Sequence, residues 1–435
     1  MEQTARPQQQ VEPFDAIVVG AGFAGMYMLH RLRGMGLKVR VFERGDGVGG
    51  TWYWNRYPGA RCDVESIEYS YQFDDELQQE WDWTERYAAQ PEILKYANHV
   101  ADRFDLRRDI RFNASVRSAH FDERSGRWTV ETEDGERATA TWCVMATGCL
   151  SSTNTPRFDG LDAFAGATYH TGAWPHEGVD FTGLRVGIVG TGSSAVQSIP
   201  IIAGQAARLT VFQRTPTYAI PAHNEPLTDA QRREVKASYA QIRAQARQTR
   251  NGIRFLPNQV SALAASERER QDEFERRWRA GGLSFSGAFN DPLLDKRAND
   301  TAAEFVRAKI RAIVADPEVA ETLSPKNVLG CKRLCIDSGY YETFNRANVE
   351  LVDVSRTPIE RLSAQGIVVA GREYACDAIV FATGFDAMTG TLLRMDIRGA
   401  GGRSLREKWE AGPRTYLDLA TAGYPNLFIV TGPGS

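Results

Sequence analysis

The chain has 435 residues, of which 52 are lysine or arginine and 55 are aspartate or glutamate, giving a formal net charge of −3. This balance leaves no basic excess for binding nucleic acid or an anionic membrane, and no apolar run approaches the roughly 18 residues that a membrane-spanning helix requires. We therefore expect two or three domains that bind neither nucleic acid nor membrane.

The six cysteines are scattered along the chain, mostly in apolar runs, and none forms a Cys-x-x-Cys pair. This usage indicates a reducing, cytoplasmic setting and not a disulfide framework. Residues 1–13 contain no apolar signal core, and we expect them to form a disordered leader.

A glycine-rich turn, Gly-Ala-Gly-Phe-Ala-Gly at 20–25, follows the apolar run 15–19 and opens a helix-like stretch. Each glycine has its own reason: Gly20 allows a tight turn, Gly22 lets a pyrophosphate approach bare backbone, and Gly25 lets the helix pack close to the strand. The helix N-terminus would present free N–H groups to the phosphates.

The next apolar run, 38–42, ends at Glu43, where a dinucleotide-binding unit carries its acid. A carboxylate suits two ribose hydroxyls, which FAD offers. The sequence therefore predicts an FAD site in this first unit.

A second turn, Gly-Thr-Gly-Ser-Ser-Ala at 190–195, repeats the pattern between the apolar runs 185–189 and 208–212, with Ala195 as a permitted replacement for the last glycine. This unit ends at Arg214, where an acid would select NADH. A guanidinium there favours the 2′-phosphate of NADPH, although a solvated surface arginine is the alternative interpretation.

Two near copies of an apolar strand ending in Ala-Thr-Gly, at 142–148 and 378–384, mark where the chain leaves one nucleotide domain and crosses to the other. The last apolar stretch, 425–432, should pair back into the first sheet. Charged and apolar residues at helical spacing predict a helical insertion at 224–329.

The predicted fold class is α/β, with two Rossmann-like dinucleotide-binding domains and a helical insertion in the NADPH domain. The expected boundaries are 14–149 and 387–435 for the FAD domain, which lacks its C-terminal part, 150–223 and 330–386 for the NADPH domain, and 224–329 for the insertion.

Two longer motifs resemble one enzyme family. Residues 164–175 fit the FxGxxxHxxxWP fingerprint of the type I Baeyer–Villiger monooxygenases, and residues 49–63 fit that family's GGxWxxxxYPGxxxD element. The likeness runs from about Phe14 to the last residue and is greatest for the phenylacetone and cyclohexanone monooxygenase branch. Within the fingerprint lie Phe164, Gly166, His170 and Trp174, and we expect His170 to act as a hinge or domain-positioning residue in preference to proton chemistry.

The resemblance implies an NADPH-dependent flavoprotein that inserts one oxygen atom of O2 beside a ketone carbonyl, through a flavin C4a-peroxide, to give an ester or lactone. Arg333 aligns with the family's active-site arginine, whose permanent charge would keep the peroxide ionised. Asp63 is expected to hold this guanidinium, with a purely structural ion pair as the alternative. Lys332 is expected to join Arg214 and Thr215 at the 2′-phosphate, unless it is a second catalytic cation.

The residues expected to bind the two cofactors, FAD and NADPH, lie in both turns, after the apolar runs that follow them, in the tryptophan-rich element 49–63, in the first Ala-Thr-Gly segment and beside Arg333. They are Gly20, Gly22, Phe23, Gly25, Glu43, Gly50, Thr51, Trp52, Tyr57, Asp63, Thr147, Gly190, Gly192, Ser193, Ser194, Arg214, Thr215 and Lys332. The aromatic members of this set could equally form a packed core. No metal site is expected.

Three alternative functions remain open. A flavin-dependent N- or S-oxygenating monooxygenase shares both turns, although Trp174-Pro175 and the Asp63 element argue against it. A disulfide reductase lacks its redox dithiol here. The third alternative is a non-catalytic remnant that only binds nucleotides. Members of the family continue past the position of Ser435 with a helix directed at the flavin. We therefore expect this chain to be partial or truncated.

Overall fold

The computed structural model describes residues 12–249, 252–254 and 258–434. The chain divides into two compact units, each made of segments that are discontinuous in sequence. Unit 1 consists of Met1–Trp54, Ile93–Asn154 and Phe385–Ser435, and unit 2 consists of Asn55–Glu92 and Thr155–Gly384.

The largest difference from the sequence-based boundaries concerns one segment. The sequence placed all of 14–149 in one domain, but Asn55–Glu92 belongs to unit 2. The physical reason is close packing, since a Cβ added at Gly59 would lie 2.2 Å from the backbone oxygen of Gln197 in unit 2. Of the expected leader, residues 1–11 lie outside the described residues, whereas Glu12 begins the first strand.

Unit 1 is built on an eight-stranded sheet with the order β17-β4-β5-β6-β1-β2-β3, in which β18 also pairs with β6. The central strand β1 is parallel to both neighbours, with Ala16 opposite Val39 on one side and Trp142 on the other. Its apolar run is buried on both faces, as a covered parallel strand requires. The final strand, β18, pairs in parallel with β6, as predicted. The strands are β1 (Glu12–Val19), β2 (Val39–Phe42), β3 (Ile110–Arg111), β4 (Val116–Asp122), β5 (Arg127–Thr132), β6 (Arg137–Met145), β17 (Asp396–Arg398) and β18 (Leu427–Ile429).

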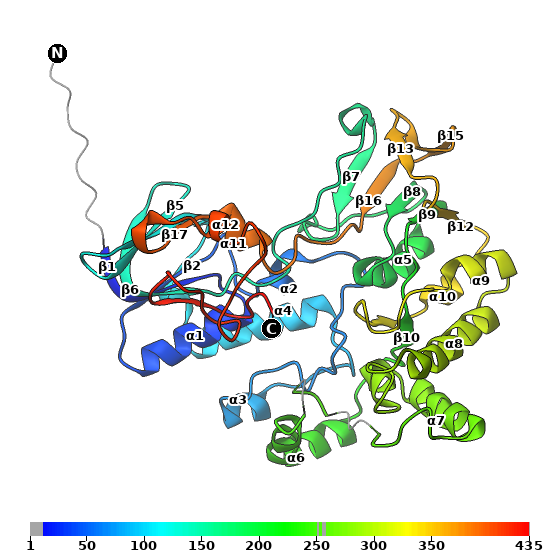
Figure 1. Ribbon diagram of the computed structural model, residues 1–435, viewed down its shortest axis with the longest axis horizontal. Helices are drawn as coiled ribbons and strands as arrows, with labels where there is room; N and C mark the ends of the chain where they lie inside the picture. The colour runs from blue at the N-terminus through cyan, green and yellow to red at the C-terminus, as the bar shows by residue number, and fades with distance from the viewer. Residues whose placement is uncertain (1–11, 250–251, 255–257, 435) are drawn as a thin grey trace. The chain divides into compact units, whose positions relative to one another are not determined.

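Along the chain, the helices of unit 1 lie between the strands of this sheet (Figure 1). The first begins directly after the glycine-rich turn, and the second begins after the glycine pair of the tryptophan-rich element. They are α1 (Phe23–Gly34), α2 (Thr51–Trp54), α4 (Gln90–Arg103), η1 (Arg107–Asp109), α11 (Gly390–Arg394), η4 (Ala400–Gly402) and α12 (Leu405–Lys408), and the first three residues of α4 are grouped with unit 2.

Unit 2 contains a five-stranded parallel sheet with the order β12-β9-β8-β16-β7. Figure 1 shows β7, β16 and β8 next to one another, with α5 following β8. This is the second Rossmann-like unit that the sequence predicted. Its elements are β7 (Ala167–His170), β8 (Arg185–Val189), α5 (Ser193–Gln205), β9 (Arg208–Gln213), β12 (Val349–Asp353) and β16 (Ala378–Phe381).

Smaller elements complete unit 2. They are the parallel pair β10 (Ala219–Pro221) and β11 (Cys335–Asp337), the antiparallel sheet β13 (Ile359–Leu362), β14 (Gly366–Val369) and β15 (Arg372–Ala375), and the helices α3 (Asp75–Glu80), η2 (Leu161–Ala163) and α10 (Tyr340–Thr343).

In the described part of 224–329 all regular elements are helices, as the amphipathic pattern predicted. Capping boxes start two of them, where Thr228 and Ser266 exchange hydrogen bonds with the third residue of each helix. The helices are α6 (Asp229–Ala246), α7 (Glu267–Ala280), η3 (Gly282–Gly287), α8 (Lys296–Ile313) and α9 (Pro317–Leu323).

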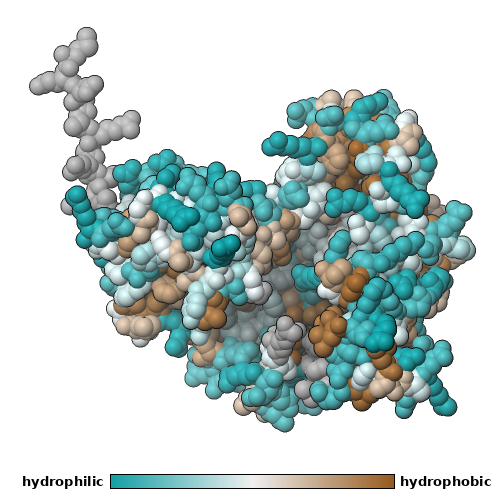
Figure 2. All heavy atoms as spheres, viewed as in Figure 1, coloured by the Kyte–Doolittle hydropathy of each residue, from teal (hydrophilic) through white to brown (hydrophobic). Residues whose placement is uncertain are grey.

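Apolar residues of the strands and of the helices form the core of each unit. The face in Figure 2 is mostly hydrophilic, with apolar side chains in small separate groups. Within the described ranges, no helix combines the length and apolar character needed to cross a bilayer.

Candidate active site

The first glycine-rich turn in unit 1 leaves no room for side chains. Gly20 has φ +104°, and a Cβ there would lie 2.5 Å from the carbonyl oxygen of Ala146. A Cβ at Gly25 would lie 1.8 Å from the carbonyl oxygen of Gly20. Gly22 and Gly50 also face each other, because a Cβ at Gly50 would lie 2.9 Å from the Gly22 Cα. The turn is therefore bare backbone in close packing at the place where the sequence predicts the pyrophosphate.

Glu43 is fixed beside this turn at the end of β2. Its side chain is buried, and its two oxygens accept hydrogen bonds from the backbone N–H groups of Ala21 at 2.7 Å and Gly45 at 2.8 Å. No side chain caps the twelve-residue helix α1 at Gly22, and the N-terminus of a helix favours phosphate oxygens. This cradle fits a dinucleotide such as FAD.

The other residues expected around this cofactor lie in different places. Thr51 and Trp52 begin α2 in unit 1, and Trp52 is buried in the protein. The backbone of Thr147 lies next to the first turn, since its Cα would be 3.5 Å from a Cβ at Gly20. Tyr57, in contrast, belongs to unit 2.

The second turn, in unit 2, repeats the first in detail. Gly190 has φ +110°, and a Cβ there would lie 2.5 Å from the carbonyl oxygen of Ala382, in the second Ala-Thr-Gly segment. Gly192 is the N-cap of α5 with no side-chain cap and open space around it. The hydroxyls of Ser193 and Ser194 contact Cys335 Sγ at 3.2 Å and Thr171 Oγ1 at 3.0 Å.

The basic residues expected at the 2′-phosphate are available for a ligand. Arg214 follows β9 and Lys332 follows Cys331, and both side chains are exposed. Among the residues that the structure describes, none forms an ion pair with either of them. Thr215 is tied to the second turn, because its carbonyl oxygen accepts a hydrogen bond from Thr191 Oγ1 at 2.9 Å.

The fingerprint residues attach β7 to the sheet of unit 2. A Cβ at Gly166 would lie 2.4 Å from the carbonyl oxygen of Asp377, while Phe164 and Trp174 are buried. His170 ends β7 opposite Phe381. Its Nδ1 accepts the backbone N–H of Gly172 at 3.0 Å, which leaves Nε2 to donate to Thr383 Oγ1 at 3.2 Å. His170 therefore links the fingerprint to the second Ala-Thr-Gly segment.

Asp63 and Arg333 form an ion pair, although they are far apart in the sequence. Arg333 Nη2 lies 2.5 Å from Asp63 Oδ2, and both residues belong to unit 2. The Asp63 side chain is only 3% exposed, whereas that of Arg333 is 60% exposed. The carboxylate is therefore buried, and more than half of the Arg333 side-chain surface is exposed.

Burial and charge act in opposite directions on this pair. Burial raises the pKa of the Asp63 carboxyl, while the charge of Arg333 and hydrogen bonds from Arg333 and Gln197 lower it in part. Burial disfavours the charge on Arg333, but the nearby Asp63, together with Cys335, Cys62 and Tyr57, outweighs this effect and raises the pKa of the guanidinium. Arg333 thus stays protonated at every working pH.

Gln197 on α5 is a neighbour of Asp63 that the sequence analysis did not identify. Its Nε2 donates to Asp63 Oδ1 at 3.2 Å, and its Oε1 accepts the Tyr57 hydroxyl at 2.8 Å. A polar side chain on a helix carries no local signal of such partners. Its position shortly after the second glycine-rich turn was the available indication.

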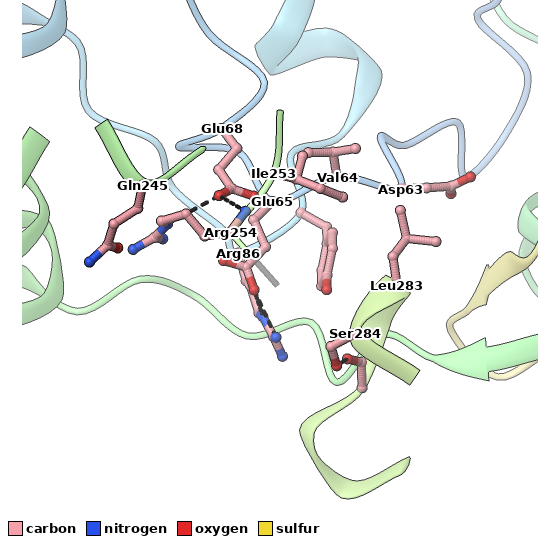
Figure 3. A pocket seen from close by; sticks show the side chains of 12 residues that line it. Asp63, Val64, Glu65, Glu68, Arg86, Gln245, Ile253, Arg254, Leu283 and Ser284 are labelled. Carbon is pink, nitrogen blue, oxygen red and sulfur yellow. Dashed lines mark hydrogen bonds and ion pairs between the residues drawn. The ribbon is translucent and has the colours of Figure 1, made fainter. Parts of the chain in front are cut away.

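A pocket of about 230 Å³ borders Asp63 in unit 2 (Figure 3). The carboxyl group of Asp63 points away from the other lining side chains. The charged lining residues pair with each other, because Glu68 accepts Arg254 at 3.0 Å and Glu65 accepts Arg86 at 2.8 Å. The remaining lining includes the apolar side chains of Val64, Ile253 and Leu283 and the ring of Tyr87.

No metal site accompanies these features, since in the described ranges no group of three histidine, cysteine or carboxylate side chains could hold an ion. All six cysteines are free thiols.

Comparisons with known proteins agree with these observations. A family model described as pyridine nucleotide-disulphide oxidoreductase matches residues 17–273. A Baeyer–Villiger monooxygenase of Pseudooceanicola batsensis is 47% identical over 424 residues, which cover 97% of this chain and 77% of the relative. A phenazine N-monooxygenase of Lysobacter antibioticus is 46% identical over 426 residues, covering 97% and 78%.

Among solved structures, an oxidised steroid monooxygenase bound to NADP superposes with a TM-score of 0.94 at 59% sequence identity. The match covers 97% of this chain and 81% of that one. The identity, the coverage and the shared fold establish that the chain belongs to the type I Baeyer–Villiger monooxygenases, which are α/β flavoproteins.

Proposed function

We propose that this protein oxygenates a ketone, with Arg333 as the fixed cation of the reaction and Asp63 as the carboxylate that holds it. The balanced reaction consumes ketone, O2, NADPH and a proton, and yields ester or lactone, water and NADP+. The observation that supports it best is the asymmetry of the ion pair, in which Asp63 is buried and Arg333 keeps 60% of its side chain exposed. Because solvent weakens the attraction between an exposed charge and its partner, exposure of Arg333 does not increase the stability of the fold.

FAD, when bound and reduced by NADPH, supplies the activation of dioxygen. We assign its pyrophosphate to the bare backbone at Gly22 and Gly50, and its ribose to Glu43. NADPH is assigned to the second turn, with Arg214 and Lys332 at the 2′-phosphate. An arginine side chain can donate two parallel hydrogen bonds to a phosphate, and a lysine adds a single positive charge.

Arg333 stabilises negative charge that develops on oxygen during the reaction. Because its guanidinium does not give up its proton, it stabilises an oxyanion without quenching it. Asp63 fixes the orientation of the guanidinium. The apolar residues that line the neighbouring pocket, among them Val64 and Leu283, suit the hydrocarbon part of a ketone. We place the protein in the cytoplasm, where its free thiols stay reduced.

The experiment is Arg333→Ala, with Arg208→Ala as a matched control. Arg208 also pairs with a carboxylate at 2.5 Å, that of Glu350, and is 56% exposed. Rapid-mixing spectra follow bleaching of the flavin by NADPH, and mass spectrometry follows ester formation from a ketone panel. We expect Arg333→Ala to bleach normally and to form no ester, and Arg208→Ala to behave like the wild type. Ester formation by Arg333→Ala at the wild-type rate would remove Arg333 from the reaction.

Oxygenation at nitrogen is the alternative, and one relative carries that name. It is disfavoured here by the complete fingerprint and the Asp63–Arg333 pair. Including a tertiary amine and a phenazine in the panel decides the matter, because an N-oxygenase would convert these and leave ketones intact.

A further inference from the structure

The side-chain amide of Gln197 joins the helix after the second turn to the segment that carries Asp63. Oε1 accepts the Tyr57 hydroxyl at 2.8 Å and the backbone N–H of Arg61 at 3.4 Å. Nε2 donates to the backbone oxygen of Arg61 at 3.0 Å and to Asp63 Oδ1 at 3.2 Å. An amide has two donor hydrogens and two acceptor lone pairs, so every hydrogen-bonding position of Gln197 is used.

Backbone packing strengthens the same junction. A Cβ at Gly59 would lie 2.2 Å from the backbone oxygen of Gln197 and 3.3 Å from Ile201 Cγ1 on the next turn of the helix. Gly59 also has φ +80°, which other residues rarely adopt. The segment from Tyr57 to Asp63 therefore rests directly on α5.

The same helix begins at the turn that we assign to NADPH. Gly192 is the N-cap of α5, and Gln197 lies on the second turn of that helix. We propose that Gln197 is a positioning residue that fixes Asp63, and through it Arg333, relative to the dinucleotide-binding end of α5. This inference rests on the proposed function for its meaning, but the contacts that carry it do not depend on a cofactor.

Gln197 also affects the charge on Asp63. The titratable groups that face this carboxyl are Arg333, Tyr57, Cys62, Tyr87 and Cys335. Burial raises the pKa of the Cys62 thiol and of the Tyr87 hydroxyl, each to about 12, so these groups are neutral near pH 7. Arg333 is the single cation in this set, and Gln197 is the neutral donor that supports the ionised carboxylate. When an ionised carboxyl loses a hydrogen-bond donor, its pKa rises by about one unit or more.

The test uses Gln197→Met, which keeps the side-chain length and removes all four hydrogen bonds, and Gln197→Glu, which keeps the acceptors and removes the donors. Gln205→Met is the control on the same helix, where the side chain is exposed and accepts one bond, from the Phe181 N–H at 3.4 Å. Carbon-13 NMR of protein labelled at the aspartate carboxyl follows the titration of Asp63, whose signal is identified by its absence in Asp63→Asn.

We expect the Asp63 titration midpoint to rise by about one pH unit in Gln197→Met and by more in Gln197→Glu. It should stay unchanged in Gln205→Met. The acid limb of the pH profile of kcat/KM should move by the same amount while kcat falls. An unchanged midpoint in either Gln197 variant overturns the proposal, and if one variant fails to fold, the other decides.

The two proposals fail in different ways. If the wild type forms no ester while the midpoint moves as expected, the positioning role stands and the reaction assignment is wrong. If the wild type forms ester and the midpoint and acid limb do not move, the reaction stands and Gln197 has no positioning role.

Discussion

Replacing Asp63 by asparagine separates the effect of the ion pair on folding stability from its effect on activity. The Asp63 side chain is 3% exposed and that of Arg333 is 60% exposed. Since solvent screens the exposed partner, we expect the attraction to contribute no more than about 1 kcal/mol to folding. Removing a carboxylate from water costs several kcal/mol. The desolvation cost is therefore the larger effect.

The direction in which the pKa of Asp63 is shifted agrees with a larger desolvation cost. Burial raises it above the value of an exposed aspartate. A raised pKa in the folded state means that folding favours the neutral carboxyl, so the stabilising contribution is complete at low pH and is lost as the pH rises through the folded-state pKa. At pH 8 we expect Asp63→Asn to be as stable as the wild type, or more stable by about 1–2 kcal/mol.

Activity should respond in the opposite direction. Asparagine can still accept the hydrogen bond from Gln197, but it cannot hold the guanidinium of Arg333 by charge. A misplaced catalytic group costs on the order of 10²-fold in rate. Urea unfolding at pH 6 and pH 8 measures stability, and ester formation measures activity. A loss of stability greater than about 2 kcal/mol at pH 8, or ester formation at the wild-type rate, would contradict this reasoning.

Three further predictions follow from the fold. Arg214→Ala should raise the KM for NADPH at least about tenfold and leave that for NADH unchanged, because only NADPH carries the 2′-phosphate; an unaltered preference for NADPH in steady-state kinetics would contradict the assignment. Gly25→Ala would place a Cβ 1.8 Å from the Gly20 carbonyl oxygen, so we expect the free energy of unfolding to fall by about 2 kcal/mol or more and the flavin content to decrease. A normal ratio of flavin to protein absorbance would argue against this prediction. Asp337 is buried and its pKa is raised from 3.8 to about 6 by desolvation, so the stability of the wild type falls as the pH rises from about 4 through 6. Asp337→Asn should gain about 2 kcal/mol relative to the wild type between pH 4 and pH 8, and a pH-independent difference in unfolding free energy would refute this.

Local steric requirements made much of the fold predictable. Gly20 and Gly190 have positive φ and stand against the carbonyl oxygens of Ala146 and Ala382. A backbone that admits no Cβ can carry only glycine, so the residue type itself records the geometry. Continuous apolar runs in the same way recorded the strands that are covered on both faces.

Other features left no local record. Asn55–Glu92 joins unit 2, although its sequence neighbours on both sides belong to unit 1. The partners of His170 and Gln197 lie far from them in the chain, at Thr383 and Asp63. A histidine at a strand end or a glutamine on a helix is compatible with many environments, and no local pattern selects among them.

The sequence by itself determined the two dinucleotide turns, the parallel strands around them and, through the family motifs, the identities of Asp63 and Arg333. Only the tertiary structure decided that one partner of this pair is buried and the other exposed, and that Gln197 ties the buried one to α5. Chemical identity is encoded residue by residue, whereas desolvation depends on which distant segments are packed against each group.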